Sequence, residues 1–393
     1  MRKAVIVIGC SYGDEGKGLA ASHAAGCRDS LCLNIMINGG AQRGHTVDFP
    51  DGRRHIFHHF GSAGLKGAVS YADEDYIVNP LLYLQEKDEL IKEFGVIPPL
   101  IISDRCRVST PWDMMLGQII EENRNDRRHG SCGCGIQETR LRFMNTDWAM
   151  RWNRLCEIRK TEYEAYCRRI IDAYIPSRLG ELGMKADAGW QDIIKNEGLI
   201  HNSWEDLQEM ISHTGRCEDW KTLGGSYPLL IFEAGQGLAL DACNLTDFPY
   251  LTPSRTTSLT SAQRIAALDG ETQTEILYVT RSYLTRHGAG PFPTECPKEE
   301  INPDMTDLTN IPNPHQQTLR YGRFDPEAVL ARTRADIKAA RCILPAAVSS
   351  VLITHLNETD GKLACEMDID AFAKHFDRTY FSFRPWDVSA QPQ

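Results

Sequence analysis

The chain has 393 residues, of which 42% are hydrophobic and 24% charged, and this composition predicts a globular protein with a sizeable core. Its formal net charge of -10 disfavours binding to nucleic-acid polymers, although small anionic ligands need only local positive charge. The 13 irregularly spaced cysteines, the lack of a signal peptide and the lack of any apolar run near ~18 residues predict a reduced, cytoplasmic protein without membrane spans.

Apolar runs and helical patterns alternate along the first part of the chain. AVIVIG, residues 4–9, predicts a buried strand, followed by a glycine-rich loop and a helix from about Lys17. LCLNIMING predicts a second strand ending at Gly39-Gly40, and HIFHHF, PLIISD and PLLIFEAGQG predict three more. Helices are predicted over 112–127 and 145–175, whereas 176–226 is polar and has no clear strand pattern.

The C-terminal part continues this alternation. EILYVTRSYLTRHGAGPFPTE fits a helix or a strand that runs into a Pro/Gly loop, and AVSSVLITHLN fits a buried strand. Residues 297–325 are loop-like and 326–342 are helical in pattern. These elements predict an α/β fold with a large, mostly parallel central sheet and helices on both faces. We expect a single domain over 1–393 with inserted subdomains at about 66–130 and 145–226.

The loop after the first strand, GCSYGDEGKGLA (residues 9–20), combines glycines with two acids. Glycines here are typical of a phosphate-binding loop, whose backbone amides would cradle a phosphate while Lys17 neutralises it. It is not a Walker A motif, because six residues rather than four separate Gly9 from Gly16-Lys17. Asp14 and Glu15 therefore stand where an anion is expected. The alternative interpretation is a polar turn with a glycine at the helix end.

Five short stretches, taken in order, resemble the adenylosuccinate synthetase family. They are GDEGKG (13–18), GHT (44–46), FEAGQG (232–237), FPYLT (248–252) and RHGAGPFPTE (286–295). The resemblance extends from Val5 to about Gly361, and it is strong in the loops and weak between them. It implies the family's P-loop-like α/β fold and a ligase that phosphorylates the 6-oxygen of a purine monophosphate and then replaces the phosphate with an amine. The implied co-substrates are a nucleoside triphosphate with Mg²⁺ and, as amine, aspartate.

The resemblance assigns the two acid–base roles to particular side chains. Asp14 matches the base that removes the purine N1 proton, and it also matches a Mg²⁺ ligand, so that its charge would face a cation. His45 matches the general acid, Gly44 matches a residue whose carbonyl touches Mg²⁺, and Lys17 matches a catalytic, phosphate-binding lysine. Without the family context, His45 fits a capping or buried hydrogen-bonding role equally well.

The remaining matches describe three binding regions. The triphosphate site would comprise Gly13, Asp14, Glu15, Gly16, Lys17, Gly18, His45, Thr46, His355 and Asn357. The purine monophosphate site would comprise Gln42, Ser131, Cys132, Arg140, Gln236 and Thr252, and the amino-acid loop would comprise Thr318 and Arg320. Within these sets, Gln236 matches a contact to the purine edge. Arg140 and Arg142 lie where the family has an arginine that reaches the partner subunit of a homodimer, and they also fit a solvated helix face.

Three stretches depart from the family pattern. In GSCGCGIQE (130–138), Cys132 and Cys134 replace a threonine and an arginine of the monophosphate loop, and Gln42 replaces an asparagine. A zinc site is disfavoured there, because the Cys-x-Cys pair lacks a second pair. In NPHQQTLRYGRFD (313–325), only Arg320 remains of the run that holds the aspartate carboxylates. In THLN (354–357), His355 and Asn357 replace the lysine and aspartate that read guanine.

The sequence therefore supports one leading hypothesis and two alternatives. The leading one is the adenylosuccinate-synthetase-type reaction with aspartate as the amine. The first alternative is the 2-aminoadenylosuccinate synthetase reaction of phage-type relatives, which act on GMP or dGMP and use ATP or dATP; Asp14 departs from those relatives, which often lack it. The second alternative is a nucleotide-binding regulatory protein that has lost ligation.

Overall fold

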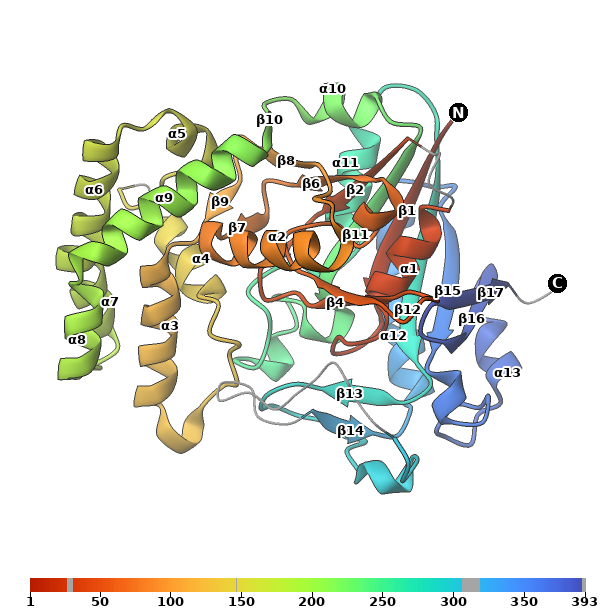
Figure 1. The fold of residues 1–393 in the computed structure, drawn as a ribbon. Helices are drawn as coiled ribbons and strands as arrows, with labels where there is room; N and C mark the ends of the chain where they lie inside the picture. The colour runs from red at the N-terminus through yellow and green to blue at the C-terminus, as the bar shows by residue number, and fades with distance from the viewer. Residues whose placement is uncertain (27–30, 146, 306–318, 391–393) are drawn as a thin grey trace.

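A computed structural model describes residues 1–26, 31–145, 147–305 and 319–390 of the chain. A ten-stranded sheet dominates it (Figure 1). In spatial order the strands are β10 (Gly215–Cys217), β8 (Leu100–Ser103), β6 (Val69–Ala72), β2 (Cys32–Met36), β11 (Leu229–Gly237), β1 (Arg2–Gly9), β12 (Thr272–Arg281), β15 (Val348–Thr354), β16 (Arg378–Arg384) and β17 (Asp387–Ala390). Neighbours pair in parallel except β16 and β17, so the predicted mostly parallel sheet is confirmed.

Side-chain alternation along β1 shows how the sheet is covered on both faces. Ala4, Ile6 and Ile8 join one buried cluster and Val7 joins another, because successive strand residues point to opposite faces. Side chains of α11 (Leu259–Ala266) and α12 (Pro326–Arg341) pack into the first cluster, and side chains of α1 (Lys17–Ala24) pack into the second. The central strand is thus buried on both sides, as its unbroken apolar run predicts.

Short strands and helices complete the molecule. Small sheets are formed by β13 (Leu284–Arg286) with β14 (Arg320–Gly322), by β3 (Gly39–Gly40), β7 (Tyr76–Val78) and β9 (Arg107–Val108), and by β4 (His45–Asp48) with β5 (Arg54–Phe57). The other helices are α2 (Pro80–Phe94), α3 (Pro111–Asn123), α4 (Ile136–Met144), α5 (Trp152–Glu157), α6 (Lys160–Arg169), α7 (Ile175–Glu181), α8 (Ala188–Ile194), α9 (Glu197–His213), α10 (Trp220–Gly225) and α13 (Ile369–Ala373). Among the described residues, no helix is both long enough and apolar enough to cross a bilayer.

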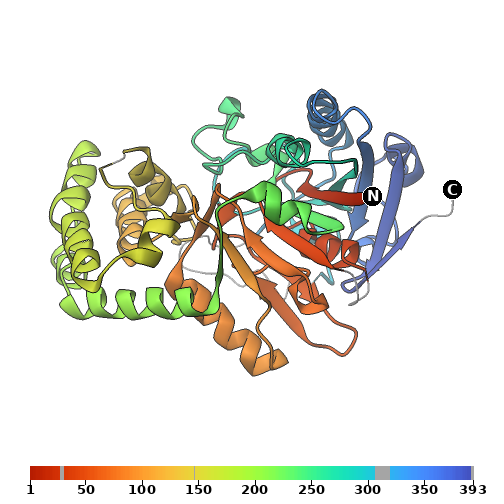
Figure 2. The same ribbon diagram turned by 90° about the horizontal axis from the view of Figure 1, so that it is seen from above.

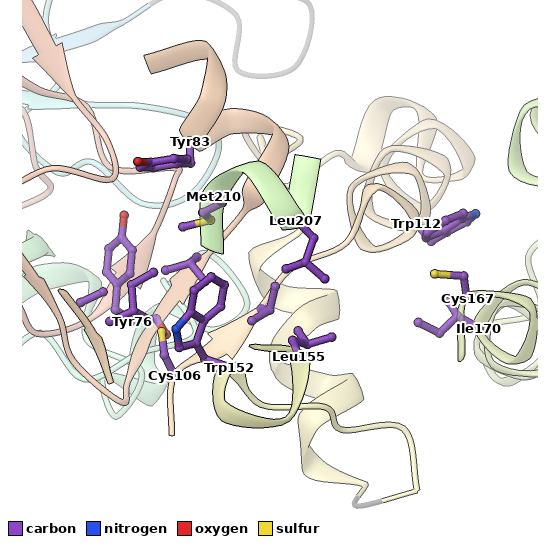
Figure 3. Close-up of a cluster of buried hydrophobic side chains, with 14 of the residues drawn as sticks. Tyr76, Tyr83, Cys106, Trp112, Trp152, Leu155, Cys167, Ile170, Leu207 and Met210 are labelled. Atoms are coloured by element: carbon purple, nitrogen blue, oxygen red, sulfur yellow. The ribbon is translucent and has the colours of Figure 1, made fainter. Parts of the chain in front are cut away.

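A helical lobe built from α3 to α9 lies to one side of the sheet (Figures 1 and 2). Its core is continuous with side chains next to the sheet, because Tyr76 and Tyr83 belong to the same buried cluster as Trp152 and Leu207 (Figure 3). The predicted insertion 145–226 supplies much of this lobe and also the edge strand β10. The predicted insertion 66–130, by contrast, contributes β6 and β8 to the central sheet itself.

Two details of the predicted elements need correction. The predicted helix 145–175 begins only at Trp152, and it is interrupted at Ile158 and Arg159, whose backbones are extended. The polar stretch 176–226 contains β10, which was missed because two of its three residues are exposed and it lies at the sheet edge. The ambiguous stretch from Glu275 is the central strand β12.

Arg142 is a structural residue of this lobe and does not lie on a solvated face. Its guanidinium is fully buried and donates to both carboxylate oxygens of Asp113, at 2.8 and 2.7 Å, and to the carbonyls of Val108 and Trp148. Asp113 also accepts from the backbone N–H of Thr110 at the start of α3. A buried, bidentate pair of this kind cannot reach a partner subunit.

Replacing Arg142 with Met is expected to lower the free energy of unfolding by about 3–5 kcal/mol, because it leaves the buried Asp113 carboxylate without its counter-charge. Urea unfolding followed by circular dichroism measures this change. Arg159→Met is the control, since its exposed pair with Glu162 is screened by solvent and should contribute much less. Similar losses for the two variants would contradict a structural role for Arg142.

Candidate active site

The carboxyl ends of five neighbouring parallel strands meet at one edge of the sheet. These are β2, β11, β1, β12 and β15, and a ligand crevice at such an edge is the general expectation for an open α/β sheet. The segments that follow these strands line a cavity of about 960 Å³. Its volume lies at the upper end of the range for ligand sites, which is roughly 300–1,000 Å³.

The loop after β1 adopts a conformation that requires its glycines. Gly13 and Gly16 have φ values of 98° and 92°, in the left-handed region that other residues avoid. Asp14, between them, shares this conformation with φ of 55°. Gly16 caps α1, so the loop brings the first residue of that helix, Lys17, to the wall of the cavity.

The side chain of Glu15 is folded back into the loop, where its carboxylate is buried and hydrogen-bonded. It is 3% exposed and accepts a hydrogen bond from the backbone N–H of Ser11, and its Oε2 lies 3.9 Å from Lys17 Nζ. A Cβ at Gly9 would lie 1.8 Å from this Oε2, so the glycine makes room for the carboxylate. Burial raises the pKa of Glu15 to about 7, against the opposing charge of Lys17.

Asp14 faces the cavity and is paired with His287, a residue that the sequence analysis did not assign. The Nε2 atom of His287 lies 2.9 Å from Asp14 Oδ2, and the two side chains are 24% and 22% exposed. Burial would raise the pKa of Asp14, but the hydrogen bond and charge of His287, with Arg281 and Lys17, outweigh it and lower the pKa to about 2. Asp14 is therefore ionised at neutral pH.

His45 reaches the same cavity because β4 packs closely on α1. A Cβ at Gly18 would lie 2.4 Å from the carbonyl oxygen of Thr46, so glycine is needed for this approach. His45 is 5% exposed, and its Nδ1 lies 2.6 Å from Oε1 of the fully buried Glu233. Its Nε2 is buried, lines the cavity region and has no hydrogen-bond partner among the described residues. A ligand in the cavity would supply that partner.

Glu233, from the FEAGQG stretch, fixes the tautomer of His45. Its carboxylate also accepts from Ser62, from Asn34 at 3.1 Å and from Arg43 at 3.4 Å. Burial would raise the pKa of Glu233, but Arg43, His45 and Ser62 together hold it well below its usual value. The ionised carboxylate is acceptor-only, so Nδ1 of His45 carries the proton. Burial and Arg43 lower the pKa of His45 to about 4, so the ring is neutral when no anion is bound.

If His45 is the general acid that the family resemblance implies, His45→Ala is expected to lower kcat by about 100-fold while leaving KM for a purine acceptor within a few-fold, because the ring would stabilise charge in the transition state. Steady-state kinetics with a varied acceptor measure both constants. His213→Ala, on the exposed end of α9, serves as the control. An increase in KM with unchanged kcat would identify His45 as a binding residue instead.

Five of the six predicted monophosphate residues share this cavity. Gln42, Ser131, Cys132, Gln236 and Thr252 all line it. Both polar atoms of the Gln42 amide are buried without a hydrogen-bond partner among the described residues. The loop 130–135 is held at both ends by glycines with positive φ: a Cβ at Gly130 would lie 2.6 Å from Gly288 Cα, and one at Gly135 would lie 2.6 Å from Asp113 C.

The segment after β15 forms a further wall. His355 has a left-handed backbone with φ of 59°, and burial together with Arg281 lowers its pKa well below the usual value. Asn357 is exposed and lines the cavity, and its side chain makes no hydrogen bond to the described residues. Six further residues that line the cavity were not predicted from the sequence: Arg281, Tyr283, Glu358, Ser382, Arg384 and Pro385.

The family model for adenylosuccinate synthetase matches residues 6–343. The chain belongs to the adenylosuccinate synthetase family. This is a family of ligases that form a carbon–nitrogen bond, and both the fold class and the enzyme class expected from the sequence are confirmed.

Adenylosuccinate synthetases of known sequence match over most of the chain. That of Prochlorococcus marinus subsp. pastoris is 27% identical over 381 residues, which cover 95% of this chain and 82% of the relative. That of Mesoplasma florum is 27% identical over 297 residues, which cover 75% of this chain and 65% of the relative. The chain thus spans just under two thirds of the Mesoplasma protein.

Two solved structures share the fold. The fully ligated adenylosuccinate synthetase of Plasmodium falciparum overlays with a TM-score of 0.64 at 19% identity, covering 90% of this chain and 77% of that one. The succinoaminodeoxyadenylate synthetase of cyanophage S-2L, solved with dGMP and with dATP as an energy donor, overlays with a TM-score of 0.65 at 15% identity. The phage overlay covers 100% of this chain and 96% of that one.

Most of the residues matched to the adenylosuccinate synthetase family share the cavity, and three of those that the structure describes do not line it. Gly13 lies just behind the wall, where its Cβ would be 3.0 Å from Gln236 Oε1. Arg140 is half-buried on α4 and outside the lining, and Arg320 is engaged by both carboxylate oxygens of Glu295, at 2.8 and 2.5 Å. Thr318 lies outside the described residues.

Oxygen donors for Mg²⁺ are present where the family resemblance implies them. Asp14 and Gly44 both line the cavity and offer a carboxylate and a backbone carbonyl, the hard ligands that Mg²⁺ prefers. Within the described ranges, no group of three or more His, Cys, Asp or Glu side chains is arranged to hold a metal.

Several positive side chains line the cavity. Lys17 is paired with Glu15, Arg54 with Asp48 at 2.8 Å, and Arg124 with Glu121. Arg281, Arg286 and Arg384 line it as well.

Proposed function

We propose that this protein is an NTP- and Mg²⁺-dependent ligase that phosphorylates the 6-oxygen of a purine 5′-monophosphate and exchanges it for an amine, with aspartate as the amine. The observation that carries the proposal is the presence in one cavity of the ionised Asp14 and of His45 oriented by Glu233. Simple nucleotide binding would need neither group in this state.

Each side chain has a chemical task in this reaction. Asp14, already ionised, accepts the N1 proton of the purine and so makes its 6-oxygen nucleophilic. Lys17 and the amides of the loop 13–18 bind the phosphates. His45 receives a proton at Nε2 when the anionic triphosphate raises its pKa, with Glu233 stabilising the charged ring, and it donates to the transferring phosphoryl group.

Asp14 and the Gly44 carbonyl would hold the Mg²⁺ ion. When bound, the ion neutralises charge on the phosphates during transfer. On the acceptor side, the Gln236 amide can both donate to and accept from a 6-oxo purine edge. Gln42, Ser131, Cys132 and Thr252 surround the acceptor phosphate, and Thr318 and Arg320 remain the proposed contacts of the amino acid.

The arginines near the proposed amino-acid site are already paired with glutamates. Arg320 is paired with Glu295, and the nearby Arg323 is paired with Glu300 at 2.9 Å. An aspartate carboxylate would have to displace Glu295 from Arg320 in order to bind there.

Phosphate release tests the reaction directly. Purified protein is mixed with Mg²⁺, with GTP or ATP, and with IMP, GMP or dGMP, each with and without aspartate. We expect phosphate release that requires both a monophosphate and an amine, and a product identified by mass spectrometry as the succinylated nucleotide. Absence of release in every mixture, with binding of nucleotides retained, would instead favour a regulatory nucleotide-binding protein.

A second candidate is the 2-aminoadenylosuccinate synthetase reaction on GMP or dGMP with ATP or dATP. It is supported by Asn357 and His355, which stand in the cavity in place of the guanine-reading aspartate and lysine. The near-complete overlay on the cyanophage enzyme, which was solved with dGMP and dATP, also supports it. In the same assay, turnover with dGMP but not with IMP would decide for this candidate.

We also propose that the protein is a cytoplasmic homodimer. The support for the dimer is the family resemblance, which has an arginine reaching the partner subunit at Arg140. Arg140 lies outside the cavity of its own chain on helix α4, where Met144 is 81% exposed. Sedimentation equilibrium of the wild type and of Met144→Glu tests this. Equal masses corresponding to one chain would contradict it.

A further inference from the structure

Residue 14 is held from two directions, by the last residue of β12 and by the residue that follows β13. Nε of Arg281 donates to its backbone carbonyl, and Nε2 of His287 lies 2.9 Å from its carboxylate. These contacts hold Asp14 in a left-handed backbone conformation, which residues other than glycine adopt infrequently. The segment 281–287 therefore determines where the Asp14 side chain lies.

The nearest lysine does not perform this task. Lys17 Nζ lies 3.9 Å from Glu15 Oε2, and Glu15 is turned back toward Ser11. The two acids of the loop thus have separate partners, Ser11 and Lys17 for Glu15 and His287 for Asp14. The contact between Asp14 and His287 faces the cavity, since both side chains line it.

His287 is itself carried on a rigid support. The preceding Arg286 is 2% exposed and donates to the carbonyls of Ala289, Pro291 and Tyr250 at 2.9–3.3 Å. The following Gly288 packs against Gly130 of the monophosphate loop. The imidazole therefore connects the proposed base with the loop proposed to hold the acceptor phosphate.

We propose that His287 is a positioning residue that orients the Asp14 carboxylate toward the acceptor purine. The inference rests on the proposed function and adds to it a residue that the sequence motifs did not assign. The role requires only an N–H donor at Nε2, which both the neutral and the charged ring can provide. A side chain with a donor at similar reach should therefore replace it in part.

Three variants test this role: His287→Ala, His287→Gln and, as the control for loss of an exposed histidine, His213→Ala. His287→Ala should lower kcat by about 10- to 100-fold, as is typical when a partner that orients a functional side chain is removed. KM for the acceptor and the thermal shifts produced by ATP and GTP should stay close to wild type. His287→Gln should recover much of the rate, because its amide can donate to the carboxylate.

The outcomes separate this inference from the proposed function. Unchanged kcat in His287→Ala, while Asp14→Asn is inactive, overturns the positioning role and leaves the proposed function standing. A raised acceptor KM with normal kcat shows that His287 binds the acceptor, and also overturns it. If Asp14→Asn itself retains a normal rate, the proposed function fails, whatever the His287 variants do. A loss of thermal stability in His287→Ala alone makes His287→Gln, assayed at the same protein concentration, the deciding variant.

Discussion

Asp14→Asn is expected to abolish turnover while leaving nucleotide binding intact. The substituted amide keeps the size of the side chain but cannot accept a proton, and general acid–base groups typically contribute about 10² to 10⁴-fold. The carboxylate is ionised in the free protein, with a pKa near 2, so it is available as an acceptor over the whole neutral range. Single-turnover assays of phosphate release, together with thermal shifts on nucleotide addition, measure the two properties separately.

The dependence of the wild-type rate on pH tests whether the Asp14 carboxylate stays ionised in acid. Because its folded-state pKa is lowered, the Asp14 carboxylate stays charged until pH falls toward 2, so no loss of rate near pH 4–5 should arise from Asp14 itself. Asp51→Asn is the matched control, since Asp51 is exposed and pairs only with Arg53 on the turn between β4 and β5. A rate near wild type in Asp14→Asn would remove Asp14 from the role of base.

The parts of the site that the sequence could predict are those in which backbone geometry demands glycine. Gly13, Gly16 and Gly18 need either positive φ or close packing, so their spacing indicates the loop without any structure. The apolar run of β1 marks the strand in the same way. Family resemblance then added the roles of Asp14 and His45, which composition and periodicity alone could not assign.

Other features depend on contacts between distant residues and could not be read from the chain. Glu15 turns inward because Gly9, six residues earlier, leaves space for it. In the sequence, Arg142 is indistinguishable from a surface arginine, and only the structure shows that it pairs with Asp113 in the core. His287 lies within one of the stretches that resemble the family. Its contact with Asp14, however, depends on the pairing of β1 with β12, which also brings Arg281 to Asp14 although the two are 267 residues apart in the chain. No local pattern carries that information.

The donor base is the point at which this chain should differ most from the family pattern. In the family, a carboxylate reads guanine by accepting hydrogen bonds from N1–H and the 2-amino group. A carboxylate is acceptor-only, so it suits those two donors and opposes adenine N1, which is itself an acceptor. Asn357 offers one acceptor and one donor group, and it lines the cavity with its amide unengaged by the described residues.

The wild type is therefore expected to accept ATP or dATP and to lack a strong preference for GTP. Sites built on hydrogen bonds of this kind discriminate by about 10⁴ to 10⁵-fold, so loss of the carboxylate should remove most of that preference. Asn357→Asp should restore it in part, raising the ratio of kcat/KM for GTP to that for ATP. Hydrogen bonds to a charged group contribute about 1.5–3 kcal/mol, which corresponds to roughly 10- to 150-fold in this ratio.

The measurement is kcat/KM for GTP, ATP and dATP at saturating acceptor and amine, in the wild type, Asn357→Asp and Asp360→Asn. Asp360 is exposed, three residues further along and outside the cavity lining, so its substitution controls for a change of charge near the segment. The alternative is that Asn357 only shapes the turn after β15 and that another residue reads the base. A strong wild-type preference for GTP, unchanged in Asn357→Asp, would establish that alternative, because the side chain at 357 would then have no influence on which purine is bound.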